Sequence, residues 1–281
     1  MDYPVGVPST TTLADWWTLS GPGISTSTNL VRVDSTSGTI FNGIDFSLHG
    51  GAQLLLVGSP NTTVENSKFG GTSYPALFTG PIQQDPASEN LTVEYTTIDG
   101  GSTGGSENQS TLIYSQGGGN VVLKYDWFKN YAQQVLDAAS STNLSYEYNL
   151  IDNGVIETSG HQNALQWTNG AATPTVAFNT LDQTSVASGE GFQLYFNGTG
   201  TTTSPTLTNN TMIAASSTNL MSYMMHGSAG SSGTTLSGTA LNNNNYFDIT
   251  GAFGAYYPGS FSGWTSSNNI NMTTGGVITP P

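Results

Sequence analysis

The sequence has no cysteine among its 281 residues, and charged side chains make up only 8% of it. Without cysteine there is no disulfide framework, no thiolate nucleophile and no zinc–thiolate site. Only 4 residues are lysine or arginine against 18 aspartate or glutamate, which gives a formal net charge of −14. Nucleic acids and anionic membrane surfaces require basic patches, so we expect neither as a partner. The same charge disfavours a highly acidic glycan as a substrate.

Long hydrophobic runs are also lacking, since no stretch approaches the roughly 20 apolar residues of a membrane-spanning helix. Few segments show the 3.6-residue period of an amphipathic helix. The sequence contains no Walker loop, no Gly-x-Ser-x-Gly elbow and no paired-histidine zinc motif. Glycine, serine, threonine and asparagine are abundant instead, and lysine is scarce. This composition favours a secreted, extracellular protein.

What the chain does contain is a repeat, which is clearest at Val93-Glu94-Tyr95-Thr96-Thr97-Ile98-Asp99. An apolar residue is followed five positions later by a second one, and successive pairs begin 23 to 35 residues apart. Such a period is typical of a solenoid. The pairs are Phe41/Phe46, Val64/Phe69, Val93/Ile98, Leu123/Phe128, Tyr146/Ile151, Val176/Leu181, Leu207/Met212 and, with a polar first member, Asn242/Phe247.

Further columns of the repeat indicate that equivalent residues stack on one another. Two and three positions after the first apolar residue, we predict an aromatic stack flanked by asparagine and a hydrogen-bonded polar ladder. Both make sense if coils lie one strand spacing apart, about 4.7–4.9 Å. The first column is Asn66, Tyr95, Tyr125, Tyr148, Phe178, Asn209 and Asn244, and the second is Ser67, Thr96, Asp126, Asn149, Asn179, Asn210 and Asn245.

Two charged columns follow the same spacing, and in each a lysine falls between acids. An opposite charge relieves the repulsion of like charges that face each other on adjacent strands. The alternative is a chance placement of solvated charges. One column is Glu65, Glu94, Lys124 and Glu147, and the other is Asp99, Lys129, Asp152 and Asp182.

A second strand with period-two alternation follows each apolar pair, for example at Leu54/Leu56 and Leu165/Trp167. We therefore predict an all-β fold, a single-stranded parallel β-helix (solenoid) of about eight coils with N- and C-terminal caps. Residues 1–38 would form the first cap, 39–250 the β-helix, and 251–281 the second cap and a tail.

The two ends of the chain carry their own signals. We interpret Trp16 and Trp17 as core residues of the first cap, in preference to a ligand platform. His49 and His226 are isolated, and we interpret both as structural. The ending Thr279-Pro280-Pro281 resembles the start of a linker, which would lead into a further module.

Three insertions, at 100–108, 153–161 and 183–190, all follow the first strand of a coil and precede the second. In a solenoid they emerge on one side, which is commonly the binding face. The short coil between them predicts a notch floored by Tyr131, Gln133 and Gln134.

Two neighbouring stretches, 160–167 and 188–194, align on their glutamines. We expect Leu165, Phe192, Trp167 and Leu194 to point inward, and four polar side chains to point outward in two rows with His161 at the lip. This surface would bind sugar hydroxyls. The expected substrate-binding residues are Asn163, Gln166, Gln193, Tyr131, Gln134 and Glu107.

For catalysis, Glu190 with either Glu157 or Asp152 would supply the two carboxylates that glycoside hydrolysis requires. His161 could serve instead as a proton carrier. The alternative is an Asn/Gln ladder that stabilises the solenoid, and Gln166 and Gln193 fit that interpretation equally well. Metal binding is the less favoured interpretation, because a hard cation needs several clustered carboxylates. Asp152, Glu157, Asp182 and Glu190 could approach one another, but their spacing does not show it, so we predict no metal site and leave Ca²⁺ as the alternative.

The run Asn120-Val121-Val122-Leu123 followed by Phe128 resembles the repeats of the right-handed parallel β-helix proteins, the pectate-lyase-like superfamily. The resemblance covers roughly residues 39 to 250, and the opening 6–13 is similar to the start of many secreted bacterial members. Members often carry His-x-Asp-Gly-Ile-Gln, and here residues 161–166 have Asn163 in place of the aspartate.

The resemblance implies right-handed winding and an extracellular polysaccharide lyase, hydrolase or epimerase, or else a tailspike or adhesin. Pectate-lyase-type catalysis implies a basic residue as proton abstractor and Ca²⁺ held by acids. Only Lys124 and Lys129 lie near the expected face. The sequence thus predicts a secreted hydrolase or lyase that binds a neutral or weakly charged polysaccharide along coils three to six. The alternatives are a non-catalytic glycan-binding module or adhesin, and a structural spike.

Overall fold

The computed structural model describes residues 3–71, 80–101, 111–131, 134–139, 142–152, 154, 163–168, 173–183, 190–193, 201–214, 221–227, 235–250 and 252–281. In these ranges the regular structure is almost all strand. The helices there are two 3₁₀ turns, η1 (Trp16–Thr18) and η2 (Leu48–Gly50). No helix in this part of the chain is long and apolar enough to span a membrane.

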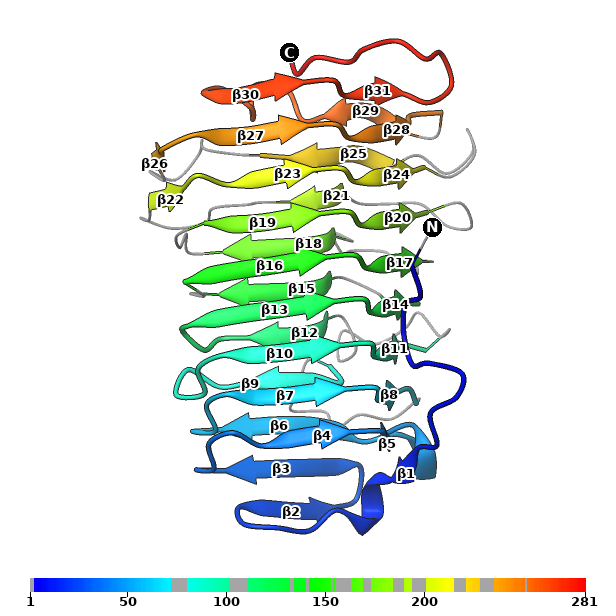
Figure 1. Cartoon of the computed structure of the whole chain (residues 1–281), viewed down its shortest axis with the longest axis vertical. Coiled ribbons are helices and arrows are strands. Elements are labelled where there is room, and N and C mark those ends of the chain that lie inside the picture. Colours follow the sequence, from blue (N-terminus) through cyan, green and yellow to red (C-terminus); the bar gives the residue numbers. More distant parts are fainter. Residues whose placement is uncertain are drawn as a thin grey trace.

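The strands form three long sheets that run side by side along the molecule (Figure 1). Sheet 1 is β1 (Ala14–Asp15), β5 (Ile44–Asp45), β8 (Lys68–Phe69), β11 (Thr97–Asp99), β14 (Trp127–Lys129), β17 (Leu150–Asp152), β20 (Thr180–Asp182), β24 (Thr211–Ile213), β28 (Tyr246–Asp248) and β31 (Ile270–Asn271). Sheet 2 is β4 (Ile40–Asn42), β7 (Thr62–Glu65), β10 (Leu91–Glu94), β13 (Asn120–Lys124), β16 (Asn143–Glu147), β19 (Pro174–Ala177), β23 (Thr206–Thr208), β27 (Ala240–Asn243) and β30 (Trp264–Ser267).

Sheet 3 is β2 (Ile24–Ser27), β3 (Leu30–Asp34), β6 (Gln53–Val57), β9 (Ile82–Gln84), β12 (Thr111–Ser115), β15 (Gln134–Ala139), β18 (Asn163–Thr168), β21 (Glu190–Gln193), β25 (Met221–His226) and β29 (Ala252–Tyr256). A small parallel pair joins β22 (Thr201–Thr203) and β26 (Thr235–Ser237). The hairpin β2–β3 is antiparallel, and β3 pairs in parallel with β6. The chain visits sheets 2, 1 and 3 in that order again and again, so the prediction of an all-β, solenoid-like fold with parallel sheets is confirmed.

The apolar pairs of the repeat form the core, and the register that the repeat predicts is confirmed. Val93 pairs with Val64 on one side and Leu123 on the other, and Ile98 pairs with Phe69 and Phe128. All six side chains are fully buried. Each side chain therefore packs on its equivalent in the next coil as well as across the interior.

The two members of each pair belong to different strands, which the sequence did not indicate. Val93 lies in β10 and Ile98 in β11, with a corner at Tyr95, where the backbone has φ +51°. Residues of the aromatic column all adopt this left-handed conformation, which is uncommon for any residue other than glycine or asparagine. Stacking compensates for the strain: the ring centres of Tyr95, Tyr125, Tyr148 and Phe178 follow one another at 4.9, 5.0 and 4.8 Å.

The predicted polar ladder is confirmed, and it runs just inside the same corner. The backbone N–H of Asn149 donates to Oδ1 of Asn179 at 3.0 Å, and that of Asn179 donates to Oδ1 of Asn210 at 3.1 Å. The series continues through Asn245 to Asn269, and these side chains are buried. The ladder satisfies backbone donors that the corner removes from the sheets.

At the N-terminal end, the interpretation of the tryptophans is half correct. Trp16 is fully buried, and its indole N–H donates to the Leu48 carbonyl at 3.0 Å. Trp17 is 51% exposed, so it is not a core residue. Successive side chains of a 3₁₀ turn point in different directions around its axis, so η1 cannot direct two adjacent indoles into the same interior.

Candidate functional site

Two predicted site residues, Asn163 and Gln166, lie in β18; Asn163 is fully buried and Gln166 is partly exposed. Asn163 is fully buried on the same side as Leu165, so the expectation that it points outward is wrong. The reason is the period of a strand, because residues two apart share a face. The predicted glutamine alignment is confirmed: Asn163 pairs with Glu190, and Gln166 with Gln193.

The expected notch floor is buried too. Tyr131 is 1% exposed, and its hydroxyl accepts a hydrogen bond from Nε2 of Gln183. Gln134 is 8% exposed; its Oε1 accepts from the Thr111 hydroxyl at 2.6 Å, and its Nε2 donates to Gln166 at 3.0 Å. Neither side chain is open to a polysaccharide, so their predicted role in binding is wrong.

The amide network explains why these polar residues tolerate burial. Oε1 of Gln166 also accepts a hydrogen bond from Nδ2 of Asn163 at 3.2 Å, so Thr111, Gln134, Asn163 and Gln166 are linked in one chain. A buried polar group costs little when its partners are present. For Gln166, the interpretation as a structural ladder residue is therefore the better one.

Several predicted site residues cannot be placed. Glu107, Glu157, His161 and Gln133 lie outside the described residues, as do the side chains of Glu190 and Gln193. Their expected roles stay predictions. Asp152 is the one predicted catalytic residue whose side chain the structure describes.

Asp152 belongs to a row of charges on the outer side of sheet 1, which we call the acidic row. The register places Lys129 next to Asp99, Asp152 next to Lys129, and Asp182 next to Asp152. Each is the last residue of its strand. The row therefore stands where the chain leaves sheet 1 for sheet 3, at the start of the three predicted insertions and the short coil between them.

The first half of the row is neutralised. Nζ of Lys129 lies 3.2 Å from a carboxylate oxygen of Asp99. Asp99 also accepts from Nδ2 of Asn130 at 2.7 Å and from the backbone N–H of Gly101 at 3.0 Å. Although partial burial opposes them, these hydrogen bonds and the lysine charge hold the pKa of Asp99 below its usual value.

The second half of the row joins two acids. Asp152 and Asp182 are registered neighbours on adjacent parallel strands, which brings their Cα atoms to about 4.8 Å. Partial burial and the Asp182 charge raise the pKa of Asp152, and Lys129 opposes that shift. A carboxyl group with a raised pKa beside a second carboxylate is the arrangement that separates a proton donor from a base.

Beside the acidic row runs an outer column that includes Trp127. The Trp127 ring is partly exposed, and Nζ of Lys129 lies 4.6 Å from its centre, a cation–π contact. The N-terminal segment passes along this column (dark blue in Figure 1). The N–H of Gly6 donates to the Tyr125 carbonyl at 2.7 Å, and that of Val7 to the Thr97 hydroxyl at 3.1 Å.

A shallow groove of about 400 Å³ continues the same face where this segment begins. Its lining includes Tyr3, Phe178, Thr180, Thr211 and Ile213. Ile213 is the registered neighbour of Asp182, so the groove adjoins the carboxyl pair. Apolar edges and hydroxyl groups of this kind suit a sugar ring.

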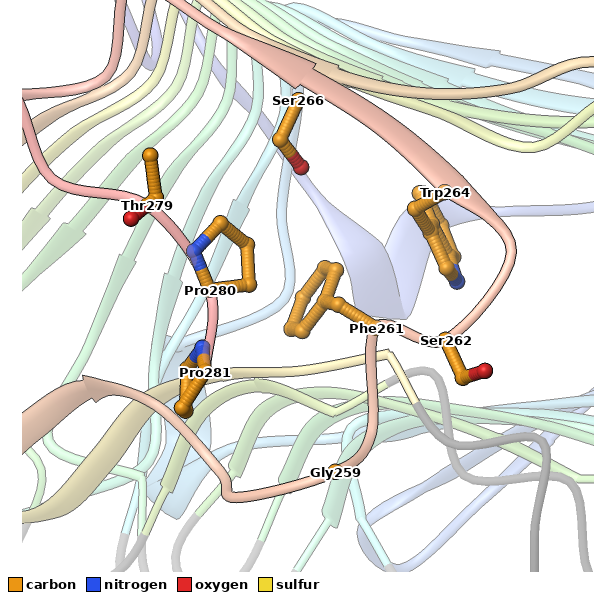
Figure 2. A pocket seen from close by; sticks show the side chains of 8 residues that line it. All are labelled: Gly259, Phe261, Ser262, Trp264, Ser266, Thr279, Pro280 and Pro281. Carbon is orange, nitrogen blue, oxygen red and sulfur yellow. The ribbon is translucent and has the colours of Figure 1, made fainter.

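A second hollow of about 400 Å³ lies at the C-terminal end, between the tail and β30 (Figure 2). Phe261 and Trp264 face Pro280 and Pro281 across it, and serine and threonine hydroxyls complete the lining. None of its lining residues is an acid or a base, so it cannot carry out acid–base chemistry.

The described residues contain no cluster of three or more His, Cys, Asp or Glu side chains that could hold a metal ion. The expectation about Ca²⁺ stays a prediction, because most residues of the three insertions lie outside the described ranges.

The sequence contains the acidic row as a column of charges that predicts a ladder, and of its members Asp152 is also predicted to be catalytic. The signal that could have identified the site is position: Asp99, Asp152 and Asp182 each stand immediately before an insertion. Comparison with known proteins adds no relative. No family model matches the chain, and neither a curated protein nor a solved structure matches it.

Proposed function

We propose that this protein is a secreted, carbohydrate-active β-helix protein that cleaves a neutral or weakly charged polysaccharide along the outer side of sheet 1. We also propose that the β-helix is right-handed, has about eight coils, and is capped by residues 1–38 and 251–281. The resemblance of the repeats to the pectate-lyase-like superfamily supports it. The same resemblance supports an extracellular, bacterial origin.

The observation that carries the proposal is the registered pair Asp152–Asp182 beside Trp127 and the groove at Ile213. Two carboxyl groups about 5–5.5 Å apart are typical of retaining glycosidases. Asp152, with the raised pKa, would protonate the glycosidic oxygen. The Asp182 carboxylate would attack or stabilise the sugar carbon. Hydrolysis is therefore favoured over elimination, in which Lys129 would have to act as the base despite its ion pair with Asp99.

The test is an assay of product release from a panel of polysaccharides with wild type, Asp152→Asn and Asp182→Asn. New reducing ends report hydrolysis, and absorbance at 235 nm reports elimination. We expect reducing ends without absorbance, and a loss of about 10²–10⁴-fold in each variant. Full activity in both variants would remove the pair from the mechanism.

A matched control comes from sheet 2. Glu65 and Glu94 are also registered neighbours, and burial raises the pKa of Glu94, but they are not followed by an insertion. Glu94→Gln should leave the rate of cleavage unchanged.

The alternative is a non-catalytic glycan-binding protein or adhesin, or a structural spike. What favours it is that Asn163, at the aspartate position of the family-like motif, is locked in a buried amide network. Binding to a polysaccharide that persists in Asp152→Asn, with no product from any member of the panel, would select the binding protein. A stable trimer that binds no polysaccharide would select the spike.

A further inference from the structure

Trp17 forms an exposed aromatic surface at the end of the stacked sheets where β1 and β2 lie (Figure 1). It stacks flat on the buried Trp16, with ring centres 5.1 Å apart and planes 9° from parallel. Trp16 is anchored by its hydrogen bond to the Leu48 carbonyl. One face of the Trp17 ring is therefore fixed by a rigid neighbour, while half of its surface stays in contact with water.

His49 stands beside this pair and not over it. Its ring centre is 4.3 Å from that of Trp17 and 6.0 Å from that of Trp16, and it is steeply inclined to both. A ring on the far face of Trp17 would lie much farther than 6.0 Å from Trp16. Among the described residues, Trp16 and His49 are the rings in contact with Trp17, and its far face accounts for the exposed half of the side chain, with the imidazole at its side.

Asp15 fixes the polar groups around the ring. One carboxylate oxygen accepts from the backbone N–H of Trp17 at 2.9 Å, and the other contacts Nε2 of His49 at 2.7 Å. The hydrogen bond from His49 lowers the pKa of Asp15. His49 itself has φ +55° and ψ +30°, an uncommon conformation for a non-glycine residue, which tends to persist where surrounding contacts impose it.

A flat indole face with a carboxylate and an imidazole held at its side matches the chemistry of a sugar ring. The C–H face of a pyranose packs on an indole, and its hydroxyls find an acceptor and a donor at the rim. Asp15 and His49 also compensate each other's charge when the imidazole is protonated, which suits a neutral ligand better than an ionic one.

The surface is separate from the acidic row. β1, which carries Asp15, is five strand steps from β17 in sheet 1 and six from β20. At about 4.8 Å a step, it lies roughly 24–29 Å from the Asp152–Asp182 pair. A ligand at Trp17 would therefore not contact those carboxyl groups.

We propose that Trp17, Asp15 and His49 form a second saccharide-binding site, which holds one neutral pyranose unit against the open face of Trp17. It anchors a polysaccharide and performs no chemistry. The site does not depend on the acidic row being catalytic.

The test is affinity electrophoresis of the full chain through native gels that each contain one neutral polysaccharide: hydroxyethylcellulose, xyloglucan, glucomannan or laminarin. Wild type should be retarded in at least one gel, Trp17→Ala should bind at least about tenfold more weakly, and Trp17→Phe should recover part of the loss. Tyr257→Ala is the matched control, because that ring is 40% exposed at the opposite end. Wild type that no polysaccharide retards, or Trp17→Ala retarded equally, overturns the proposal.

Two measurements keep this result separate from misfolding and from the cleavage proposal. If Trp17→Ala does not fold, oxidation of wild type by N-bromosuccinimide replaces it: the bound polysaccharide should protect Trp17, and unchanged oxidation overturns the site. Asp152→Asn should keep full retardation, because it affects cleavage only. A loss of retardation in that variant would place binding at the acidic row and refute a separate site.

Discussion

Asp126 offers the sharpest test of how the polar ladder works, through the substitution Asp126→Asn. Asp126 is fully buried in a column that is otherwise mostly asparagine. Its Oδ1 accepts from the backbone N–H of Thr96 at 2.8 Å, but within the described part of the chain its Oδ2 has no hydrogen-bond partner. At the equivalent position Asn149 directs its Nδ2 at the Leu123 carbonyl, at 3.0 Å. At the point where the ladder needs a donor, Asp126 can donate only in its protonated form, whereas an asparagine amide donates at every pH.

The structure gives both the sign and the size of the effect. An unpaired buried polar group costs about 1–3 kcal/mol, and an asparagine amide would remove that cost by donating along the ladder. Burial also raises the pKa of Asp126 well above its usual value. The folded state therefore keeps a proton that the unfolded state releases above about pH 4. Wild type then loses stability as the pH rises, by up to about 1.4 kcal/mol per pH unit until the folded pKa is reached.

The assay is the thermal midpoint of wild type and Asp126→Asn at several pH values from 4 to 8. The variant should be the more stable protein, and its advantage should grow with pH. Asp248→Asn gives the opposite sign in a lower window: hydrogen bonds from Thr250 lower the pKa of Asp248, so its charged form stabilises the fold. Wild type should lose its advantage over this variant as the pH falls below about 4, which thermal midpoints at about pH 2 to 5 would show. An Asp126→Asn protein that is less stable, or whose advantage does not depend on pH, would refute this account of the ladder.

The remaining predictions concern the corner and the N-terminal segment. Tyr125→Ala removes the ring contacts with Tyr95, Tyr148 and Tyr3, each worth about 0.5–1.5 kcal/mol, and should lower the thermal midpoint accordingly. Asn179→Ala leaves the Asn149 N–H and the Tyr146 carbonyl unpaired and should cost several kcal/mol in urea unfolding, whereas the exposed Asn143→Ala should cost far less. Gly6→Ala should release the N-terminal segment, because its new Cβ would lie 2.5 Å from Oγ1 of Thr97 at φ +70°; faster hydrogen exchange at residues 6–7 is the measurement.

Sequence reasoning recovered the register because stacking repeats a chemical environment at a near-constant interval. Val64, Val93 and Leu123 share one environment, so their spacing alone gives the pairing. The corners were missed for an equally physical reason. A left-handed residue is normally signalled by glycine or asparagine. Asparagine stands at both ends of the column, but in its middle an aromatic residue takes the position, as at Tyr125 with φ +59°. The stacked rings that stabilise it exist only once the coils are assembled.

The error at Asn163 has a different origin. Asn163 and Leu165 are two residues apart, so a single strand must place them on one side, and the polar character of Asn163 was given more weight than its position. Polarity misled because the interior of sheet 3 carries its own polar partners, from Thr111 through Gln134 to Asn163. A buried amide looks the same in sequence as a binding residue until its partners are known.

The charged side chains of the acidic row have the same ambiguity, because structural and catalytic acids look alike in the sequence. A comparison of the acidic pairs on sheets 1 and 2 decides the function. The outer sides of sheets 1 and 2 each carry an acidic pair with a lysine next to it, Asp152–Asp182 with Lys129 and Glu65–Glu94 with Lys124. In both pairs burial raises the pKa of one carboxyl group, so electrostatics alone does not distinguish them. What differs is location: one pair adjoins the groove and the insertions, while the other stands where β7 and β10 turn tightly into the next strand. If cleavage depends on a groove that holds the sugar against the acids, Asp152→Asn must abolish it and Glu94→Gln must not. An equal loss of cleavage activity in both variants would mean that the acids act through the stability of the stacked coils, and that the outer side of sheet 1 is not catalytic.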